Sequence, residues 1–475
     1  MTTTYDTSPA RSGPSTLLMW AILGLVLLAD ALDMIDSTVT NIAAPTIADE
    51  LGAGEGLIKW LGASYALAMG VLLVVGGRLG DKFGQRRVFL VGMAGFTIAS
   101  AVCGLSPDAL LLVVARVAQG AFGALMLPQG MAIMTRTFSR EMLAKAFGLF
   151  GPLLGIASVG GPVLAGFVID WDIAGLSWRP IFLVNVVLGV IGLALAVRLL
   201  PRDDGDRDTV IDGWGSGILA VAMFGLMFGL IEGSTAGWGP VPIASLIVGA
   251  CAAALFAYRQ AHTADPLLRP SLFKNRGFTS GLVMGLLVFA ATSGLVYVLS
   301  LFMQLGIGAS AREASLGLLP LTLGIIVAAG ATMGGLMTRL GRTLVVLGLG
   351  GIVVGVGWLL ALVAASGTDL GLWMMAPPIF VIGLGMGACY GTIFDIALGD
   401  IDADEAGSAS GSMSAIQQLA TGIGSATVTT VFFQLATGSE VHAMEISLVI
   451  VLVAAAICLP VVRLLPRRAP AELAH

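Results

Sequence analysis

The sequence has 475 residues, of which 57% are hydrophobic and 11% charged. A soluble domain carries about 25% charged residues, and a mean hydropathy of +0.96 also indicates an apolar environment. These values exclude a water-soluble globular protein, a disordered chain and a disulfide scaffold. The net charge of −5 carries little information, because in a membrane protein the placement of charges matters more than their sum.

Fourteen apolar segments are long enough to cross a membrane, where a helix needs about 20 residues. The first is predicted to be a permanent helix, because its apolar run is too long for a signal peptide and lacks a convincing cleavage site. The sequence therefore predicts an all-α integral membrane protein with fourteen transmembrane helices. The predicted spans are 17–46, 57–77, 88–106, 109–135, 142–169, 179–200, 213–232, 241–259, 277–305, 314–337, 344–366, 372–398, 407–437 and 443–463.

Positive charges predict the orientation of these spans. When the N-terminus is placed in the cytoplasm, twenty of the 24 Lys and Arg residues fall in cytoplasmic segments. Such a bias sets the orientation of membrane proteins. We therefore expect both termini in the cytoplasm, with tails at 1–16 and 466–475.

An internal repeat divides the chain. The loop GGRLGDKFGQRR at 76–87 returns in a shorter form, GGLMTRLGR, at 334–342, and the spans that begin at 17, 109 and 142 are matched by spans that begin at 277, 372 and 407. The sequence thus predicts two six-helix halves, 17–200 and 277–465, joined by a linker, 201–276, that contains two extra helices. Repeated halves are typical of transporters with a binding site at the repeat interface.

The 76–87 loop resembles the loop between the second and third helices of the major facilitator superfamily, which acts there as a conformational latch between the halves. The matching residues are Gly77, Asp81, Gly84 and Arg86. Glycine permits a tight turn and a close approach of helices, and an aspartate can pair with cations or cap a helix N-terminus. An ordinary basic cytoplasmic loop is the alternative interpretation.

The fifth predicted span contains GPLLGIASVGGPVLAG at 151–166, which resembles the antiporter motif of exporters in this superfamily. Gly161, Pro162, Ala165 and Gly166 match the core of that motif. Small residues form a thin helix face on which another helix can pivot, and proline weakens the hydrogen-bond ladder. Ordinary small-residue packing would produce the same pattern.

The fourth span contains RVAQGAFGALMLP at 116–128, which resembles the helix-4 motif of the superfamily, with Arg116, Gln119, Gly120 and Gly123 matching. An arginine within a span costs about 2.5–3.5 kcal/mol on insertion scales. We therefore expect Arg116 to face a cavity or a partner. Extension of its side chain to the outer interface is the alternative.

The first span carries three acids, Asp30, Asp33 and Asp36, at three-residue spacing, which keeps them on adjoining parts of one helix face. At 1.5 Å rise per residue, the depth of Asp36 permits a contact with Arg116 if their helices are adjacent. A purely structural hydrogen-bonding role is the alternative. The stretch DSTVTNIAAP resembles the helix-1 signature of the fourteen-span drug:proton antiporters, and the matching residues are Asp36, Thr38, Asn41, Ala43 and Pro45.

These resemblances imply a proton-coupled multidrug exporter in the inner (plasma) membrane of a bacterium. Burial disfavours the charged form of a carboxylate, so protons and a lipophilic cationic drug can alternately neutralise Asp33 and Asp36. The expected proton-coupling and substrate residues are Asp33, Asp36, Asp30, Arg116 and Asn41.

No phosphate loop, metal-ligand cluster or nucleophile–His–Asp set is visible in the sequence. We therefore expect no enzymatic activity, no cofactor and no metal. Because the cations are spread over many segments, nucleic acid is not an expected partner. The expected partners are small lipophilic molecules, protons and the lipid bilayer, and the expected state is a monomer.

Three other functions are alternatives to this one. A dedicated exporter of a single endogenous metabolite or antibiotic would share every motif above. A non-transporting membrane sensor would need an appended soluble domain, and the longest predicted cytoplasmic loops are short. A nutrient importer is disfavoured by the motif in the fifth span.

Overall fold

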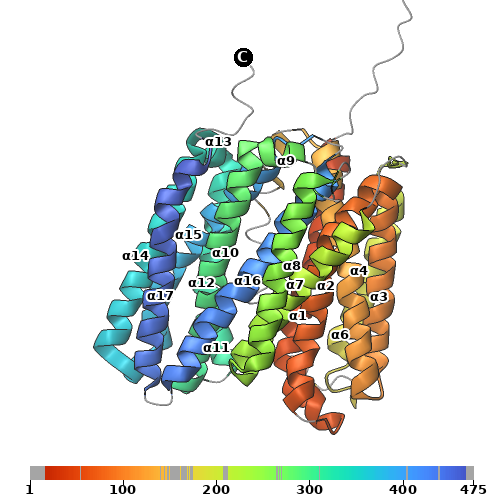
Figure 1. Ribbon diagram of the computed structural model, residues 1–475. Helices are drawn as coiled ribbons and strands as arrows, with labels where there is room; N and C mark the ends of the chain where they lie inside the picture. Colours follow the sequence, from red (N-terminus) through yellow and green to blue (C-terminus); the bar gives the residue numbers. More distant parts are fainter. Residues whose placement is uncertain are drawn as a thin grey trace, which may run out of the picture.

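The computed structural model describes residues 16–53, 55–139, 175–206, 212–263, 270–309, 311–402, 405–436 and 439–466, with scattered positions at 141–171, 266 and 268. The described secondary structure is entirely helical. Figure 1 shows the helices side by side in one bundle, with the N-terminal helices in red to orange on one side and the C-terminal helices in blue-green to blue on the other.

The N-terminal group consists of α1 (Thr16–Glu50), α2 (Glu55–Phe83), α3 (Gln85–Leu105), α4 (Ala109–Thr137) and α6 (Pro180–Leu199). Helix α4 packs against α1, α2 and α3, while α6 packs against α1 and α3. The predicted fifth span, 142–169, falls almost entirely outside the described residues. Of its motif, Gly161 is a buried helical position, and Pro162, Ala165 and Gly166 lie outside the described residues.

Two helices follow as a hairpin, α7 (Gly213–Ala236) and α8 (Pro240–His262). Their backbones approach closely at Gly225 and Gly249, where a Cβ on Gly225 would lie 2.7 Å from the Cα of Gly249. Helix α7 also packs against α2 and α16, whereas the packing of α8 is mainly against α7. In Figure 1 this hairpin lies in green near the centre of the view, where the two groups of helices meet.

The remaining helices form the C-terminal group, within which α10 packs against α15, α16 and α17, and α15 also packs against α12 and α14. Helix α10 continues into a π-helical turn, η2 (Phe302–Gly306), and short 3-10 turns, η4 (Gly367–Asp369) and η5 (Val462–Leu464), follow α14 and α17. The α-helices of this group are α9 (Pro270–Lys274), α10 (Arg276–Leu301), α11 (Ala311–Gly317), α12 (Leu319–Ala331), α13 (Met337–Leu340), α14 (Arg342–Ser366), α15 (Leu372–Leu398), α16 (Ala406–Ala436) and α17 (Glu440–Val461).

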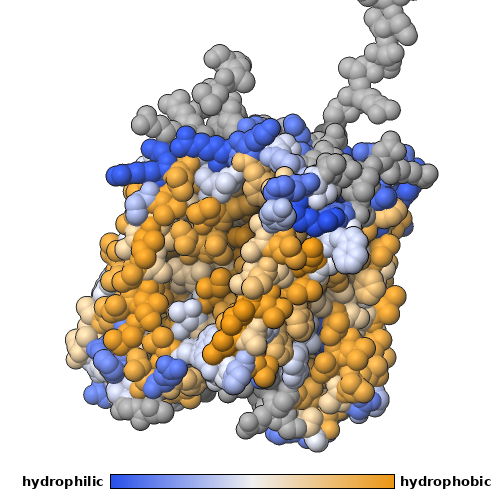
Figure 2. Space-filling model, viewed as in Figure 1, coloured by the Kyte–Doolittle hydropathy of each residue, from blue (hydrophilic) through white to orange (hydrophobic). Residues whose placement is uncertain are grey.

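Eleven helices among the described residues are long and apolar enough to cross a membrane. Figure 2 shows the corresponding exterior, an apolar band between two hydrophilic ends. Large apolar side chains such as Val187, Ile247 and Val354 are exposed on these helices. Exposure of so large an apolar surface to water is strongly unfavourable, so the chain is a multi-pass membrane protein.

The predicted span 314–337 differs from the structure, which divides it into α11, α12 and a π-helical turn, η3 (Thr332–Leu336). Pro320 lies in the first turn of α12, where its missing N–H costs nothing. Gly335, at φ 93°, has a left-handed conformation that interrupts the regular helix. The predicted span 407–437 is present as α16, which is 31 residues long but is not among the eleven apolar helices.

Candidate functional site

The three acids of the first predicted span all lie on α1 and are buried, with exposed fractions of 7% for Asp30, 6% for Asp33 and 2% for Asp36. Helices α2, α4 and α6 pack against α1, and each supplies polar side chains to them. We call Asp30, Asp33, Asp36 and Arg116 the acid site.

Asp36 is held by three donors from two neighbouring helices. Arg116 of α4 donates to its Oδ2 and forms an ion pair with it. Gln119 of α4 and Asn185 of α6 donate to its Oδ1, at 2.9 Å and 2.6 Å. A buried ion pair is tolerated when further hydrogen bonds satisfy its remaining atoms. The two amides supply them for the carboxylate, whereas Nη2 of Arg116 is buried and has no hydrogen-bond partner among the described residues.

Arg116 itself is fully buried. Its Nε donates to the carbonyl of Leu61 on α2 at 3.1 Å, and its Nη1 donates to Oε1 of Gln119 at 2.7 Å. The guanidinium carbon lies 4.3 Å from the ring centroid of Tyr65 and 5.8 Å from that of Phe182, close enough for cation–π attraction. The side chain thus faces protein partners and does not extend to the membrane interface.

The other two acids have fewer donors. Asp33 accepts a hydrogen bond from the hydroxyl of Tyr65. The Oδ2 atom of Asp30 is buried and has no hydrogen-bond partner among the described residues. The number of side-chain donors among the described residues therefore decreases from Asp36, which has three, to Asp33, which has one.

Sequence reasoning missed two contributors, Tyr65 and Asn185. A polar residue inside an apolar span is the signal that could have found Asn185, which is 1% exposed near the start of α6. Tyr65 offers a weaker signal, because tyrosine is common in spans near the interface. Asn41, a predicted site residue, lies on α1, and its side chain is not described.

The 76–87 loop connects the two groups of helices. A Cβ on Gly77 of α2 would lie only 2.3 Å from the carbonyl oxygen of Gly407 on α16, so the helices touch at their backbones. Asp81, also on α2, accepts a hydrogen bond from the hydroxyl of Ser408 at 2.9 Å. Two predicted latch residues thus contact the C-terminal group directly.

The other two predicted latch residues, Gly84 and Arg86, contact the last turn of α6 and the segment that follows it. Gly84 has φ 94° and forms the turn between α2 and α3. It has no side chain to cap α3, and the carboxylate of Asp203 accepts the N–H groups of Gln85 and Arg86 at 2.5 Å and 3.0 Å instead. The guanidinium of Arg86 donates to the carbonyl of Val197 at 2.7 Å.

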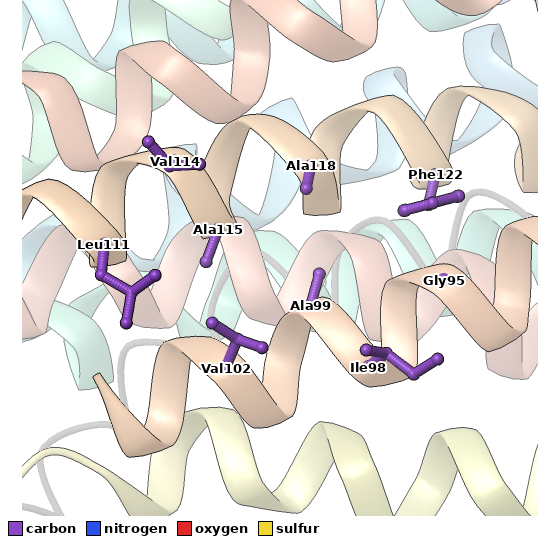
Figure 3. Close-up of a pocket in the computed structure, with 9 residues that line it drawn as sticks. All are labelled: Gly95, Ile98, Ala99, Val102, Leu111, Val114, Ala115, Ala118 and Phe122. Atoms are coloured by element: carbon purple, nitrogen blue, oxygen red, sulfur yellow. The ribbon is translucent and has the colours of Figure 1, made fainter.

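A separate apolar cavity of about 270 Å³ lies between α3 and α4. Figure 3 shows its lining, which comes from these two helices alone and contains only apolar side chains and one glycine. No residue of the acid site lines it. The lining residues are Gly95, Ile98, Ala99, Val102, Leu111, Val114, Ala115, Ala118 and Phe122.

An all-helical, multi-pass fold with charged residues buried between its helices defines a membrane protein with an intramembrane functional site. The chain belongs to the Major Facilitator Superfamily, whose profile matches residues 26–425. This confirms the predicted superfamily. The chain is accordingly a transporter and not an enzyme.

Relatives support this assignment. Over 430 residues the chain is 37% identical to the "Probable actinorhodin transporter" of Streptomyces coelicolor, an alignment that covers 90% of this chain and 74% of that protein. It is 31% identical over 427 residues to the "Tetracenomycin C resistance and export protein" of Streptomyces glaucescens, covering 88% and 76%. The solved structure of the proton:xylose symporter XylE shares the fold, with a TM-score of 0.64, 14% identity and coverage of 94% and 96%.

Proposed function

We propose that this chain exports lipophilic, cationic compounds in exchange for protons. The observation that carries the proposal is the buried acid site, in which three carboxylates and one guanidinium meet within membrane-spanning helices. Charges at such a position are costly and mark substrate or proton pathways. Export is supported by the name of the relative from Streptomyces glaucescens, a resistance and export protein.

The proposed mechanism is competition for the acid site. Asp36 neutralises Arg116 when it is charged, and proton binding weakens that ion pair. Asp33 and Asp30 have fewer donors than Asp36, and a proton or a cation from the inner leaflet or the cytoplasm alternately neutralises them. Entry of a proton then displaces the substrate, and the membrane potential contributes about 2.3 kcal/mol per charge per 100 mV.

The proposal extends to the arrangement of the chain. We assign it to the fourteen-span drug:proton antiporter type, as a monomer in the bacterial inner membrane with both termini in the cytoplasm. Residues 17–200 and 277–465 are the two halves that move, and α7 and α8 are inserted between them. Gly77, Asp81, Gly84 and Arg86 hold the cytoplasmic side closed until the halves rock apart, and the motif of Gly161, Pro162, Ala165 and Gly166 is the pivot.

Efflux of ethidium, a lipophilic cation, from proteoliposomes with an imposed pH gradient tests the exchange. We expect gradient-driven efflux by the wild type, loss of most of that activity in Asp36→Asn, and unchanged activity in the matched control Glu141→Gln, whose carboxylate is 81% exposed. Efflux that continues at the wild-type rate in Asp36→Asn would contradict the role of Asp36. Absence of gradient-driven export for ethidium, actinorhodin and tetracenomycin C alike would contradict the proposed exchange.

The second candidate function is a dedicated exporter of one compound, which the single-compound names of the two relatives favour. A susceptibility panel of dyes, quaternary amines and several antibiotics in a sensitive host separates the two. Protection against many of these compounds indicates the broad exporter, and protection against one indicates the dedicated exporter.

A further inference from the structure

Tyr65 of α2 contacts both Asp33 and Arg116 of the acid site. Its hydroxyl donates a hydrogen bond to Asp33, and the face of its ring lies 4.3 Å from the guanidinium carbon of Arg116. The side chain is 2% exposed, so water does not replace either contact. One aromatic ring therefore joins a carboxylate of α1 to the cation of the Asp36–Arg116 ion pair.

Two glycines of α4 allow Tyr65 to pack closely against that helix. A Cβ on Gly120 would lie 2.3 Å from the carbonyl oxygen of Tyr65, and a Cβ on Gly123 would lie 3.3 Å from its hydroxyl oxygen. Both glycines belong to the motif that begins at Arg116. Their absent side chains allow α2 to approach α4 closely enough for the ring to reach Arg116 and Asp33 together.

We propose that Tyr65 couples the charge state of Asp33 to the Asp36–Arg116 ion pair. Tyr65 acts as a positioning residue and does not itself exchange the proton. This inference rests on the proposed function, because it assigns a role within the same acid site. Under this proposal, neutralisation of Asp33, as well as of Asp36, weakens the contacts that hold Arg116.

The physical basis is the strength of the two contacts. A hydrogen bond to a charged carboxylate is roughly twice as strong as a neutral one, so Tyr65 is held firmly while Asp33 is charged. When a proton neutralises Asp33, the hydroxyl loses most of that restraint. The ring can then turn, and the guanidinium loses the aromatic face on which it is stacked.

The charged and titratable groups around Asp33 come from four helices. Asp30 and Asp36 lie on α1, Tyr65 on α2, Cys103 on α3 and Arg116 on α4. Cys103 reaches the site through Gln119, whose Oε1 it contacts at 3.7 Å. Helix α6 adds the neutral amide of Asn185. A change at Tyr65 alters one donor to Asp33 and leaves these other groups in place.

The test measures the pH dependence of the conformation in the full chain. Spin labels are attached to cysteines that replace Phe83 and Arg339, two exposed residues in the repeated loops. The protein also carries Cys251→Ser, which removes the exposed native cysteine, while the other three cysteines are buried. Distance distributions between the labels are recorded over a pH series. We expect two populations whose ratio changes with pH, and in Tyr65→Phe a midpoint that moves to higher pH by roughly one unit or more, since a donor to the charged form of Asp33 is lost.

Two controls separate coupling from a general structural effect. Tyr390→Phe removes a buried hydroxyl that bonds to Thr292 at 2.6 Å, far from α1 in the sequence, and should keep the wild-type midpoint. In an Asp33→Asn background, Tyr65→Phe should produce no further shift. Tyr65→Phe retains the ring, and gel filtration together with thermal unfolding verifies its fold.

The inference is overturned by an unmoved midpoint in Tyr65→Phe, by an equal shift in the Asp33→Asn background, or by a wild-type conformation that does not respond to pH. Failure of the proposed function is distinguishable from these outcomes. If the midpoint moves as expected but no proton-driven efflux occurs in proteoliposomes, the export proposal fails and the coupling through Tyr65 stands.

Discussion

The ion pair between Arg116 and Asp36 lies out of contact with water, with exposed side-chain fractions of 0% and 1%. Removing water from two charges is expensive, and their attraction offsets that cost only when the remaining atoms are hydrogen-bonded. Gln119 bonds to both members of the pair and also to the hydroxyl of Ser100 at 2.8 Å. This amide therefore fixes the orientation of both charges, and its replacement would loosen the pair without changing the net charge.

The energetic argument leads to a test with single and double substitutions. Arg116→Met leaves Asp36 buried without its counter-charge and should lower the free energy of unfolding by about 3–5 kcal/mol, whereas Arg116→Met with Asp36→Asn should recover most of that loss. Thermal unfolding in detergent measures the effect, and ethidium efflux should remain low in both variants. A double variant no more stable than the single one would show that the pair does not control stability here.

At the scale of helices, the contact between α2 and α16 depends on missing side chains. Gly77 faces the carbonyl of Gly407, and a Cβ on Gly411 would lie 2.9 Å from the carbonyl oxygen of Leu73. Two successive turns of α16 thus touch the backbone of α2. Ser408 and Asp81 add a hydrogen bond beside this contact.

Gly77→Ala should separate α2 from α16 by forcing their backbones apart. Gly24→Ala on α1 is the matched control, because a Cβ there meets no atom within 4 Å. Replacing glycine by alanine at an exposed helix position raises the free energy of unfolding by about 0.5–1 kcal/mol. The label pair at Phe83 and Arg339 should report longer distances in Gly77→Ala and wild-type distances in Gly24→Ala. Identical distributions in the two variants would contradict the contact.

The hairpin of α7 and α8 is joined at one end by Asp212, which caps α7 and binds the guanidinium of Arg259 through two hydrogen bonds of 3.0 Å and 2.8 Å. These bonds from Arg259 hold the pKa of Asp212 below its usual range. A lowered carboxylate pKa contributes stability that is present above the unfolded-state value, about 3.9, and is lost as the pH falls through the folded-state value.

Asp212→Asn isolates that contribution, because asparagine also caps helices well. At neutral pH we expect the variant to unfold at a lower temperature, by an amount that corresponds to about 1 kcal/mol or less. The difference from the wild type should shrink as the pH falls below about 4, where Asp212 becomes protonated in both states. A difference that is independent of pH would mean that the ion pair is not its source.

At the scale of the whole molecule, the sequence identified helices and motifs better than it identified contacts. The three acids of α1 and Arg116 were recognisable in the sequence, because charge is rare in an apolar span. The contacts of Tyr65 with Asp33 and Arg116 were not recognisable, because they depend on how far α2 is rotated about its axis. A helix that is apolar on every side carries little periodic signal for that rotation. The interrupted span around Gly335 escaped prediction for a related reason, since glycines in membrane helices more often mark close packing than a break.

The orientation of the molecule remains a prediction that follows from charge alone. The turn after α1 at Gly52 and the C-terminal tail should lie on opposite sides of the membrane, because the tail and its preceding loops carry the excess of Lys and Arg. Alkaline phosphatase, which is active only outside the cytoplasm, should be active when inserted at Gly52 and inactive when fused to the C-terminus. Green fluorescent protein at the C-terminus should give the complementary result. Phosphatase activity at the C-terminus would reverse the assignment, and the 76–87 loop and Asp203 would then close the outer face of the transporter instead of the cytoplasmic one.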